Sequence, residues 1–454
     1  MPHISLNPAT GKVEREFPSW DGDQLDAALE AAHVAETNWR RASFAQRGEV
    51  LTRVAERLLA NRDDYATLIT REMGKLRREA HAEVEKSALA CDYYALHAAD
   101  FLEDEVIETD AARSYVSYQP LGIVLAVMPW NFPFWQVFRA AAPALMAGNV
   151  VVLKHSSNVP GCALAIEEIF RSAGLPPYVF TTLMIDAGQV ARVIADPRVC
   201  AVTFTGSEPA GRMVAMEAGR YLKKCVLELG GSDPFIVLRD ADLNDASTQA
   251  VNARFLNNGQ SCIAAKRFIL VPEIADEFVR LFRQKVAALR LGDPMKNSCQ
   301  IGPMARLDLR DELHRQVTDA IVQGAQPLLG CEPVEGEGAY YLPSILDRVM
   351  PKARAYHEEL FGPVAVVIRA RSEQDALDIA NATRFGLGAS LWSRDAGHAE
   401  KLSRRIEAGC CFINGMVKSD PRLPFGGVKA SGFGRELSYH GIREFVNIKT
   451  VWVK

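Results

Sequence analysis

Cys262 is the side chain most suited to covalent chemistry, and it ends the run Gly259-Gln260-Ser261-Cys262. We expect this run to open a helical turn. A thiol becomes a useful nucleophile when its thiolate is stabilised, which a helix N-terminus or nearby hydrogen-bond donors can do. A single cysteine near a glycine is more often structural. Cys262 therefore needs partners before a catalytic role can be assigned to it.

Glu228 is the first candidate partner, upstream in the run Leu227-Glu228-Leu229-Gly230-Gly231 at the end of a β-rich stretch. A carboxyl group between apolar neighbours is a candidate for a raised pKa. The two glycines beside it leave it room to move, so Glu228 is a candidate general base. The alternative is a glutamate exposed at the end of a strand.

Asn131 is the second candidate partner, within Pro129-Trp130-Asn131-Phe132-Pro133. Two prolines stiffen this turn, so the Asn131 amide would be presented in a fixed direction. A fixed amide N–H is what an oxyanion hole requires. The alternative is a rigid loop whose aromatic rings only pack.

The bulk composition is that of an ordinary globular protein. The chain has 454 residues, 48% hydrophobic and 24% charged, which is enough for about two or three domains. A net charge of -4 gives no electrostatic reason to expect a nucleic-acid or membrane partner. The first 17 residues lack the apolar core of a secretory signal, and the most apolar stretch, 121–128, is too short to span a bilayer. We therefore expect a cytoplasmic protein.

The cysteines and histidines indicate neither a disulfide framework nor a metal site. The nine cysteines are scattered along the chain, no pair has C-x-x-C spacing, and only Cys410 and Cys411 are close in sequence. The nine histidines do not cluster with other ligand types. We therefore expect no bound metal.

The elements that would position these side chains alternate between strand and helix after a helical opening third. Short β-rich runs are expected at 123–127, 149–153, 178–183 and 199–204, with helices beginning at Pro160 and after Ser207. A second alternating region has strands at 235–238, 267–271, 363–368 and 410–413. This pattern predicts two α/β domains with parallel, doubly wound sheets, which bind ligands at the carboxyl ends of their strands. We place the boundary near Leu229-Gly230-Gly231.

Taken together, the segments closely resemble the aldehyde dehydrogenase superfamily, nearly from end to end. The family's blocks occur in order as Pro129-Trp130-Asn131-Phe132-Pro133, Phe204-Thr205-Gly206-Ser207, Glu228-Leu229-Gly230-Gly231, Gly259-Gln260-Ser261-Cys262, Glu359-Leu360-Phe361-Gly362-Pro363 and Pro424-Phe425-Gly426-Gly427, the last running on through Ser431-Gly432-Phe433-Gly434-Arg435-Glu436.

The resemblance implies an α/β fold with two doubly wound parallel-sheet domains and a small β oligomerisation arm. The nicotinamide cofactor-binding domain would comprise 1–110 and 123–228, the catalytic domain 229–434, and the arm 111–122 and 435–454. The arm would pair with another subunit, so a homodimer or homotetramer is expected. Independent support comes only from Val451-Trp452-Val453, which has the character of an edge strand.

The resemblance also implies how the three side chains would work together. Cys262 would attack the carbonyl of an aldehyde, while the Asn131 side chain and the Cys262 backbone N–H would hold the oxyanion. Loss of hydride to the nicotinamide would leave a thioester. Glu228 would activate the water that hydrolyses this thioester, so the covalent intermediate divides the oxidation into two easier steps.

The usual dinucleotide fingerprint, G-x-G-x-x-G after a strand, is missing. Gly206-Ser207 lies instead at a strand-to-helix turn, where helix N–H groups can accept a pyrophosphate. By resemblance, Glu359 would bind the nicotinamide ribose, Phe361 would pack against the nicotinamide and Trp130 would line the same groove.

The choice between NAD and NADP depends on the residues after the second predicted strand. Lys154 would reach the adenine ribose, and Ser157 stands where many NAD-preferring relatives carry a glutamate. Because Lys154 is cationic and position 157 carries no carboxylate to repel a phosphate, a 2′-phosphate should be tolerated. We therefore expect NADP to be preferred, with NAD also used. His155 is expected to be a solvent-facing turn residue.

Arg139 carries the prediction of the substrate. An arginine in the apolar run 138–142 is costly to bury unless an anion meets it, and the alternative is an intramolecular salt bridge. By resemblance, family members that oxidise succinate semialdehyde place an arginine here for the substrate carboxylate and a serine where Ser419 stands. The chain is most similar to their short bacterial subgroup. Other branches carry a second arginine where this chain has Leu256, which leaves glutarate semialdehyde or other small aldehydes open.

Two other functions were weighed against a hydrolytic NAD(P)-dependent dehydrogenase. Some relatives form acyl-CoA esters or reduce acyl phosphates, but they usually lack the glutamate base or the Pro-Trp-Asn block. A non-catalytic binding protein on the same fold would be expected to lose the nucleophile or the base. This chain keeps Cys262, Glu228 and Asn131, which disfavours both.

Overall fold

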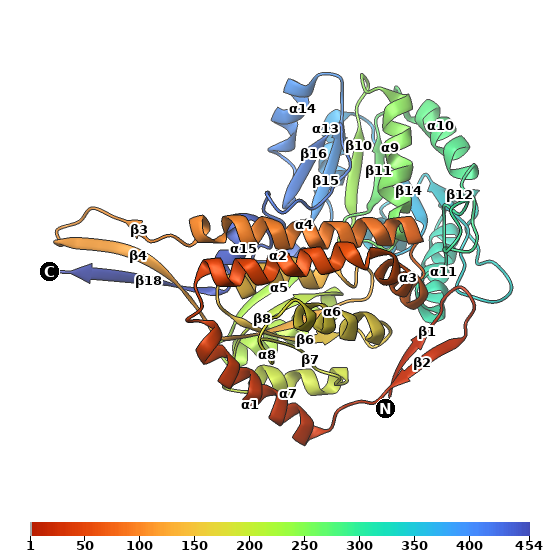
Figure 1. Ribbon diagram of the computed structural model, residues 1–454. Helices are drawn as coiled ribbons and strands as arrows, with labels where there is room; N and C mark the ends of the chain where they lie inside the picture. The colour runs from red at the N-terminus through yellow and green to blue at the C-terminus, as the bar shows by residue number, and fades with distance from the viewer. Residues whose placement is uncertain (1) are drawn as a thin grey trace.

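The strand–helix alternation folds into two sheets, seen in a computed structural model that describes residues 2–454 (Figure 1). The first sheet has six strands, which are parallel except for its short edge strand. Its central strands are rich in valine and other apolar residues and are buried on both faces, as expected of a parallel sheet covered by helices. In order across the sheet they are β17 (Gly432–Phe433), β9 (Lys224–Glu228), β8 (Val199–Thr205), β5 (Ile123–Met128), β6 (Val150–His155) and β7 (Phe180–Thr182).

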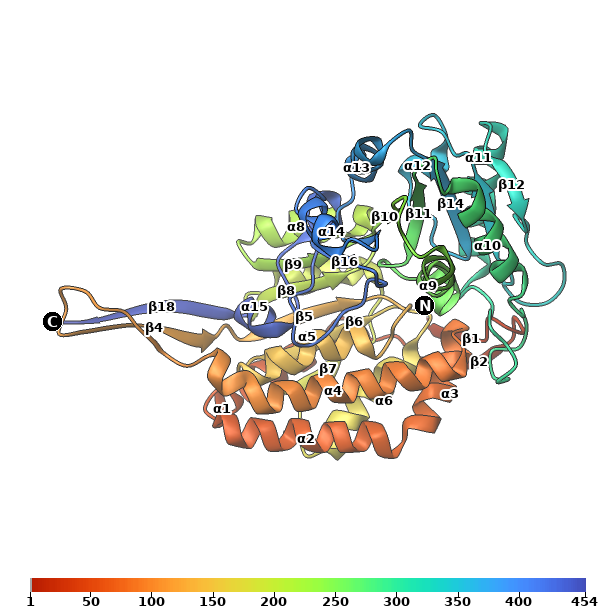
Figure 2. The ribbon, with the colours of Figure 1, turned by 90° about the horizontal axis from the view of Figure 1, so that it is seen from above.

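Helices cover both faces of this six-stranded sheet. In Figure 2, α2 and α4 lie on one side of it and α8 lies on the other. The helices and the 3₁₀ turn η1 are α1 (Gly22–Trp39), α2 (Phe44–Ala60), α3 (Arg62–Met73), α4 (Arg77–Phe101), α5 (Trp135–Met146), α6 (Pro160–Ser172), η1 (Ala187–Gln189), α7 (Val190–Ala195) and α8 (Glu208–Arg220). The helices predicted to begin at Pro160 and after Ser207 are confirmed by α6 and α8.

The second sheet has seven strands, parallel except for the β12–β13 pair. In order they are β12 (Gln326–Leu329), β13 (Ser344–Asp347), β14 (Val364–Arg369), β11 (Ala265–Leu270), β10 (Asp233–Val237), β15 (Gly388–Trp392) and β16 (Cys410–Ile413). The helical elements around it are α9 (Leu243–Phe255), η2 (Leu256–Gly259), α10 (Ala275–Ala287), α11 (Leu307–Val322), α12 (Arg354–His357), α13 (Glu373–Asn381) and α14 (Ala396–Ser403). All eight strands predicted from the β-rich runs are present in the two sheets, within a few residues of the expected ends.

After the seven-stranded sheet the chain returns to the six-stranded one. The turn η3 (Lys429–Ser431) leads into β17, which pairs antiparallel with β9 so that Gly432 lies opposite Glu228. The helix α15 (Ser438–Arg443) follows. This return brings the segment that holds Glu436 beside the end of β9.

Two small sheets complete the fold. A hairpin of β1 (His3–Leu6) and β2 (Val13–Phe17) lies near the N-terminus. The strands β3 (Glu105–Val106), β4 (Arg113–Pro120) and β18 (Val446–Val453) form an arm that extends away from the rest of the molecule (Figure 1). The predicted edge strand at 451–453 is the end of β18, which has β4 on one side only.

Within residues 2–454, none of the helices combines the length and apolar character needed to cross a membrane. All nine cysteines are free thiols. The same residues contain no cluster of histidine, cysteine, aspartate and glutamate side chains suited to holding a metal ion.

Candidate active site

A cavity of about 490 Å³ lies in front of Cys262, between the two sheets. One wall is a face of α4, where Glu79, Glu83 and Lys86 follow each other at helical spacing. The start of α5 and the loop 416–419 complete it. In Figure 2, α4 lies beside α2 on one face of the six-stranded sheet domain, and the side chains on one of its faces line this cavity. The space suits a small organic molecule.

The loop before Cys262 has an unusual backbone. Asn257, Asn258 and Gly259 have φ of 56°, 54° and 75°, a left-handed conformation that asparagine and glycine tolerate best. A Cβ on Gly259 would come within 2.3 Å of the Gly362 carbonyl oxygen, so only glycine fits. The helical turn expected from Gly259 onward is wrong. The 3₁₀ turn η2 ends at Gly259, and Cys262 lies in a turn before β11.

Two buried cations fix this loop by binding backbone oxygens. The Arg254 guanidinium donates to the carbonyls of Gly259 and Leu360, which joins the nucleophile loop to the segment that carries Glu359. Lys266 Nζ donates to the Cys262 carbonyl at 2.8 Å and lies 3.1 Å from Glu359. The nucleophile and Glu359 are therefore held in one rigid network.

The Cys262 thiol is half-buried, and burial raises its pKa to about 12. The positive charges of Arg139 and Lys266 oppose this shift, and the negative charges of Glu359 and Glu228 add to it. At neutral pH the sulfur therefore carries its proton and needs a base before it can attack.

The Asn131 amide is held on both sides. Its Nδ2 donates to the Gln260 carbonyl at 3.0 Å, and its Oδ1 accepts from Gln136 Nε2 at 3.1 Å. Asn257 Nδ2 donates in turn to the Asn131 carbonyl. An amide nitrogen has two hydrogens, so one N–H remains for a ligand. The orientation therefore comes from Gln136 and Gln260, in addition to the two prolines of the turn.

Glu228 lies at the end of β9, is 1% exposed, and neither carboxylate oxygen has a hydrogen-bond partner among the described residues. Burial raises its pKa well above the ordinary range, and the negative charge of Glu436 raises it further. Arg139 and Arg435 act in the opposite direction. An unpartnered, buried carboxyl group of this kind is suited to exchanging a proton.

Arg139, on α5, forms an ion pair with Glu436 through Nε and donates from Nη2 to Thr205 at 3.2 Å. Its guanidinium also lies 5.1 Å from the Phe425 ring centroid. Arg139 therefore forms the intramolecular salt bridge that the sequence analysis gave as the alternative to binding an anion. Arg139 also lines the cavity, so its positive charge acts on the cavity as well as on Glu436.

The strand-to-helix turn at Gly206-Ser207 has free donors. Ser207 is the N-cap of α8, and its side chain makes no hydrogen bond to the first turn. The Gly206 N–H donates to the Glu228 carbonyl, which anchors the turn to β9. The exposed backbone N–H groups at the start of α8 therefore suit an anionic group such as a pyrophosphate.

Trp130 and Phe361 meet edge to face, with ring centroids 5.8 Å apart. Both rings are half-buried. Glu359 accepts from the Gly231 N–H at 3.2 Å in addition to its pairing with Lys266. Of these three predicted cofactor residues, Glu359 is tied to the segment after Glu228 through Gly231 and to the strand after Cys262 through Lys266.

At the end of β6, the position of His155 differs from the one expected from the sequence. His155 is 5% exposed, and its ring nitrogens contact the carbonyls of Met128 and Pro133, so the solvent-facing position is wrong. Burial lowers its pKa to about 4. Ser157 is exposed in the following turn. Lys154 is buried, which lowers its pKa, and the nearby charge of Asp186 partly opposes that shift. The sequence had not indicated Asp186.

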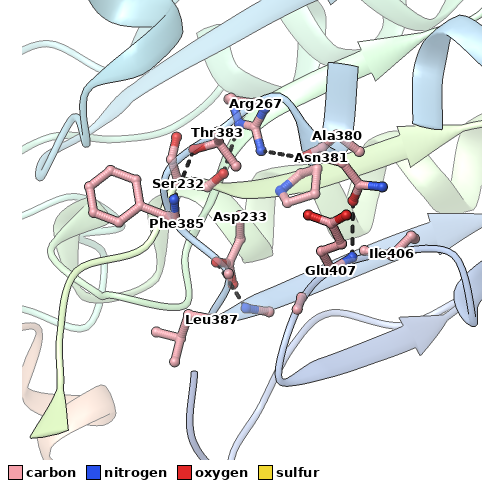
Figure 3. Close-up of a pocket in the computed structure, with 14 residues that line it drawn as sticks. Ser232, Asp233, Arg267, Ala380, Asn381, Thr383, Phe385, Leu387, Ile406 and Glu407 are labelled. Atoms are coloured by element: carbon pink, nitrogen blue, oxygen red, sulfur yellow. Dashed lines mark hydrogen bonds between the residues drawn. The ribbon is translucent and has the colours of Figure 1, made fainter. Parts of the chain in front are cut away.

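A second cavity, near Asp233, is too small for a substrate. Figure 3 shows the residues that line it, which come from the seven-stranded sheet and the segments near 380–388 and 406–408. Its volume is about 10 Å³. That is roughly the space of one water molecule. Arg267 is bound there to the carbonyls of Ser232 and Ala380, and Asp233 accepts from the Gly388 N–H. We regard this polar cluster as structural.

With the geometry described, comparison with known proteins identifies the family. The model for "Aldehyde dehydrogenase family" matches residues 3–451. The chain belongs to the aldehyde dehydrogenase family. The α/β fold class with two parallel-sheet domains is thereby confirmed.

Individual relatives of this aldehyde dehydrogenase match it over the whole chain. "Probable succinate-semialdehyde dehydrogenase [NADP(+)]" of Synechocystis sp. is 52% identical and covers 100% of both chains. "Succinate semialdehyde dehydrogenase [NAD(P)+] Sad" of Escherichia coli is 48% identical and covers 99% of this chain and 97% of its own. The crystal structure of succinic semialdehyde dehydrogenase from Streptococcus pyogenes with NADP+ superposes with a TM-score of 0.98, 38% identity and 99% coverage of both chains.

Four of the twelve predicted site residues of this aldehyde dehydrogenase lie in or beside the large cavity. Cys262, Arg139 and Ser419 line the large cavity, and Asn131 is bonded to the carbonyl of Gln260 beside it. Glu228 does not line that cavity, although its charge acts on the Cys262 thiol. The individual roles of these side chains stay predictions.

Sequence reasoning missed several residues of the same site. Glu436 lay inside a recognised block, yet only the return of the chain through β17 places it beside Glu228. Arg254 and Lys266 flank Cys262 in sequence and looked like ordinary charges. Lys86 lies in a long charged helix, where nothing in the sequence separates a cavity-facing lysine from an exposed one.

Proposed function

We propose that this aldehyde dehydrogenase oxidises succinate semialdehyde to succinate, with NADP preferred and NAD also used. The observation that carries the proposal is a half-buried thiol, Cys262, facing a cavity that also holds Arg139 and Ser419. The names of the relatives, at about half identical residues over the full chain, support the same substrate.

In the first step, the Cys262 sulfur bonds to the aldehyde carbon and forms a thiohemiacetal. The thiolate is the attacking species, and the raised pKa of Cys262 means that a base must take the thiol proton. The buried carboxylate of Glu228 is the candidate acceptor. The developing oxyanion receives the second N–H of Asn131 and the Cys262 backbone N–H. Conversion of the thiohemiacetal to a thioester requires loss of a hydride from the former aldehyde carbon, for which a bound nicotinamide would be the acceptor.

Before the second step, Glu228 releases to solvent the proton that it accepted from Cys262. It then takes a proton from water, and the resulting hydroxide attacks the thioester carbon. The carbon–sulfur bond breaks, the acid leaves, and the Cys262 sulfur recovers its proton. The absence of a hydrogen-bond partner for the Glu228 carboxylate supports this role, because the side chain is free to turn toward the sulfur. The oxyanion donors serve both steps.

The residues present fit a nicotinamide dinucleotide. The uncapped start of α8 at Ser207 suits the pyrophosphate, and Glu359 would bind the nicotinamide ribose beside Phe361 and Trp130. Lys154 and the exposed Ser157 would meet the adenine ribose. A 2′-phosphate would compensate the buried charge of Lys154, which supports the preference for NADP.

For the substrate, we propose that Arg139 and Ser419 contact the carboxylate of the semialdehyde. Arg139 keeps one terminal nitrogen, Nη1, without a partner among the described residues. Leu256 lines the cavity at the position where other branches carry a second arginine. Glutarate semialdehyde is therefore the alternative substrate to compare.

We also propose the domain limits given by the resemblance, 1–110 and 123–228 for the cofactor, 229–434 for catalysis, and 111–122 and 435–454 for the arm. The arm would pair with a second subunit in a homodimer or homotetramer. Exposed apolar side chains on β18, namely Ile448, Trp452 and Val453, support such a pairing. A cytoplasmic location stays a prediction from the sequence.

Steady-state kinetics of the purified protein test this function. Succinate semialdehyde, glutarate semialdehyde and butanal are each oxidised with NADP and with NAD, without coenzyme A or phosphate, and reduced nicotinamide is followed by absorbance. We expect kcat/KM for succinate semialdehyde with NADP to exceed that for butanal by at least about tenfold, because a cavity cation recognises the carboxylate. No turnover of succinate semialdehyde, or equal values for butanal, would overturn the proposal.

A further inference from the structure

The cavity in front of Cys262 holds a second cation, Lys86, on α4. Its Nζ donates to the Ser419 hydroxyl at 2.7 Å and lies 4.2 Å from the Trp135 ring centroid. The ammonium is therefore held in place by a hydroxyl on one side and an aromatic face on the other. Both contacts leave donor hydrogens free, because an ammonium group has three.

No carboxylate of residues 2–454 lies within 4.0 Å of the Lys86 ammonium. The neighbouring acids are engaged elsewhere. Glu83 forms an ion pair with Lys75 and accepts the N–H groups of Phe134 and Trp135, and Asp420 pairs with Arg422. Lys86 is thus a cation in a cavity without a counter-ion.

The charges facing Lys86 explain how it would respond to an anion. Burial lowers its pKa to about 8, and the charges of Arg139 and Lys418 lower it as well. Asp420 and Glu83 oppose the shift without reversing it. A carboxylate bound beside the ammonium would supply the missing negative charge and stabilise the protonated form of Lys86. An anionic ligand therefore gains more binding free energy here than beside an exposed lysine.

Arg139 differs because its charge is already met by Glu436. Leu256, in the same cavity, supplies no charge. We infer that Lys86, together with Ser419, is the principal anchor of the substrate carboxylate and selects acid aldehydes over uncharged ones. This inference deepens the proposed function, on which it rests.

The test compares Lys86→Met, which keeps the length and removes the charge, with Lys86→Arg, which keeps the charge. Lys418→Met is the matched control, because Lys418 is exposed at the rim of the same cavity. Each variant is assayed with succinate semialdehyde and with butanal, which has the same number of carbon atoms. Melting temperatures and kcat for butanal show that the fold and the chemistry are intact.

For Lys86→Met we expect KM for succinate semialdehyde to rise about 10- to 100-fold, as loss of a charge-assisted contact implies, with KM for butanal within about twofold. Lys86→Arg should recover much of the loss. Lys418→Met should change either KM by less than about twofold, because its charge is screened. Equal increases for both aldehydes in Lys86→Met, or none for succinate semialdehyde, would overturn the inference.

Inhibition of butanal oxidation by succinate separates this inference from the proposed function. Succinate should compete with butanal in the unsubstituted enzyme and should lose about 10-fold or more in affinity in Lys86→Met. If the enzyme does not prefer succinate semialdehyde but its inhibition by succinate still depends on Lys86, Lys86 is the carboxylate anchor and the proposed substrate is wrong. If Lys86→Met leaves the inhibition by succinate unchanged, Lys86 is not the carboxylate anchor, whichever aldehyde is the substrate.

Discussion

Two charged regions lie near Cys262, and they are built differently. The cavity in front of the thiol is open and holds Lys86, a cation without a carboxylate partner. The cluster that contains Glu228 is closed, and there the charge of Glu436 is matched by Arg139. One region has an unbalanced positive charge, and the other has a carboxyl group whose ionisation is suppressed.

The difference separates recognition from proton transfer. An unpaired cation in a cavity gains from binding an anion, so the first region suits recognition of a substrate carboxylate. A buried carboxyl group beside a second acid has a raised pKa, so the other region suits general-base chemistry near neutral pH. Arg139 belongs to both, because it lines the cavity and pairs with Glu436.

Replacing Glu228 with glutamine should have the largest effect on turnover. We expect kcat to fall about 10²- to 10⁴-fold, the usual range for loss of a general base. If Glu228 serves mainly hydrolysis, rapid mixing should still give a burst of reduced nicotinamide close to one per active site. A variant without any burst would show that Glu228 is also needed to deprotonate Cys262. Unchanged turnover would contradict its role as the base.

Replacing Glu436 with glutamine should change the pH profile. Glu228 must be ionised to accept a proton, so hydrolysis increases as the pH rises through its raised pKa. Glu436→Gln removes the negative charge that raises this pKa and frees Arg139 to lower it. The rise in kcat should therefore move to lower pH by roughly one unit. An unmoved profile, measured with a stable fold, would mean that the two carboxyl groups do not interact.

Arg139→Met should have a smaller effect on substrate recognition than Lys86→Met. We expect KM for succinate semialdehyde to rise only about 3- to 10-fold, because the charge of Arg139 is already compensated by Glu436. The substitution also leaves Glu436 buried and unpaired, which should destabilise the fold by about 3–5 kcal/mol.

The double variant Arg139→Met/Glu436→Gln removes both charges of this pair and is the control for stability. Its melting temperature should recover toward that of the unsubstituted protein. A KM effect of Arg139→Met larger than that of Lys86→Met, once stability is restored in this way, would reverse the assignment of the two cations.

The sheets could be predicted from the sequence where strands are long and apolar. The run 150–153 is a continuous series of valines and leucine, and it is the buried centre of β6. Strands β13 and β15 were not predicted, since Ser344–Asp347 and Gly388–Trp392 are short and contain small or polar residues. Their strand conformation comes from pairing with neighbours that are distant in sequence.

At the site, sequence reasoning reached the residues that lie in recognisable blocks and failed where a contact joins distant segments. His155 was expected to be a solvent-facing turn residue, yet the carbonyls of Met128, at the end of β5, and of Pro133, in the loop after it, contact its ring. The expected helical turn at Gly259 was wrong because close approach to Gly362 fixes that backbone instead. In both cases long-range packing overrides the local pattern.

The sequence by itself determined the family, the two parallel-sheet domains, and Cys262, Glu228 and Asn131 as the candidate catalytic group, since these depend on residue types in ordered blocks. Only the tertiary structure decided how charge is distributed around the thiol. Arg139 is paired and Lys86 is not, because β17 returns Glu436 to the six-stranded sheet while the acids near Lys86 are bound to other partners. Electrostatic balance depends on distances through space, which the order of residues along the chain does not specify.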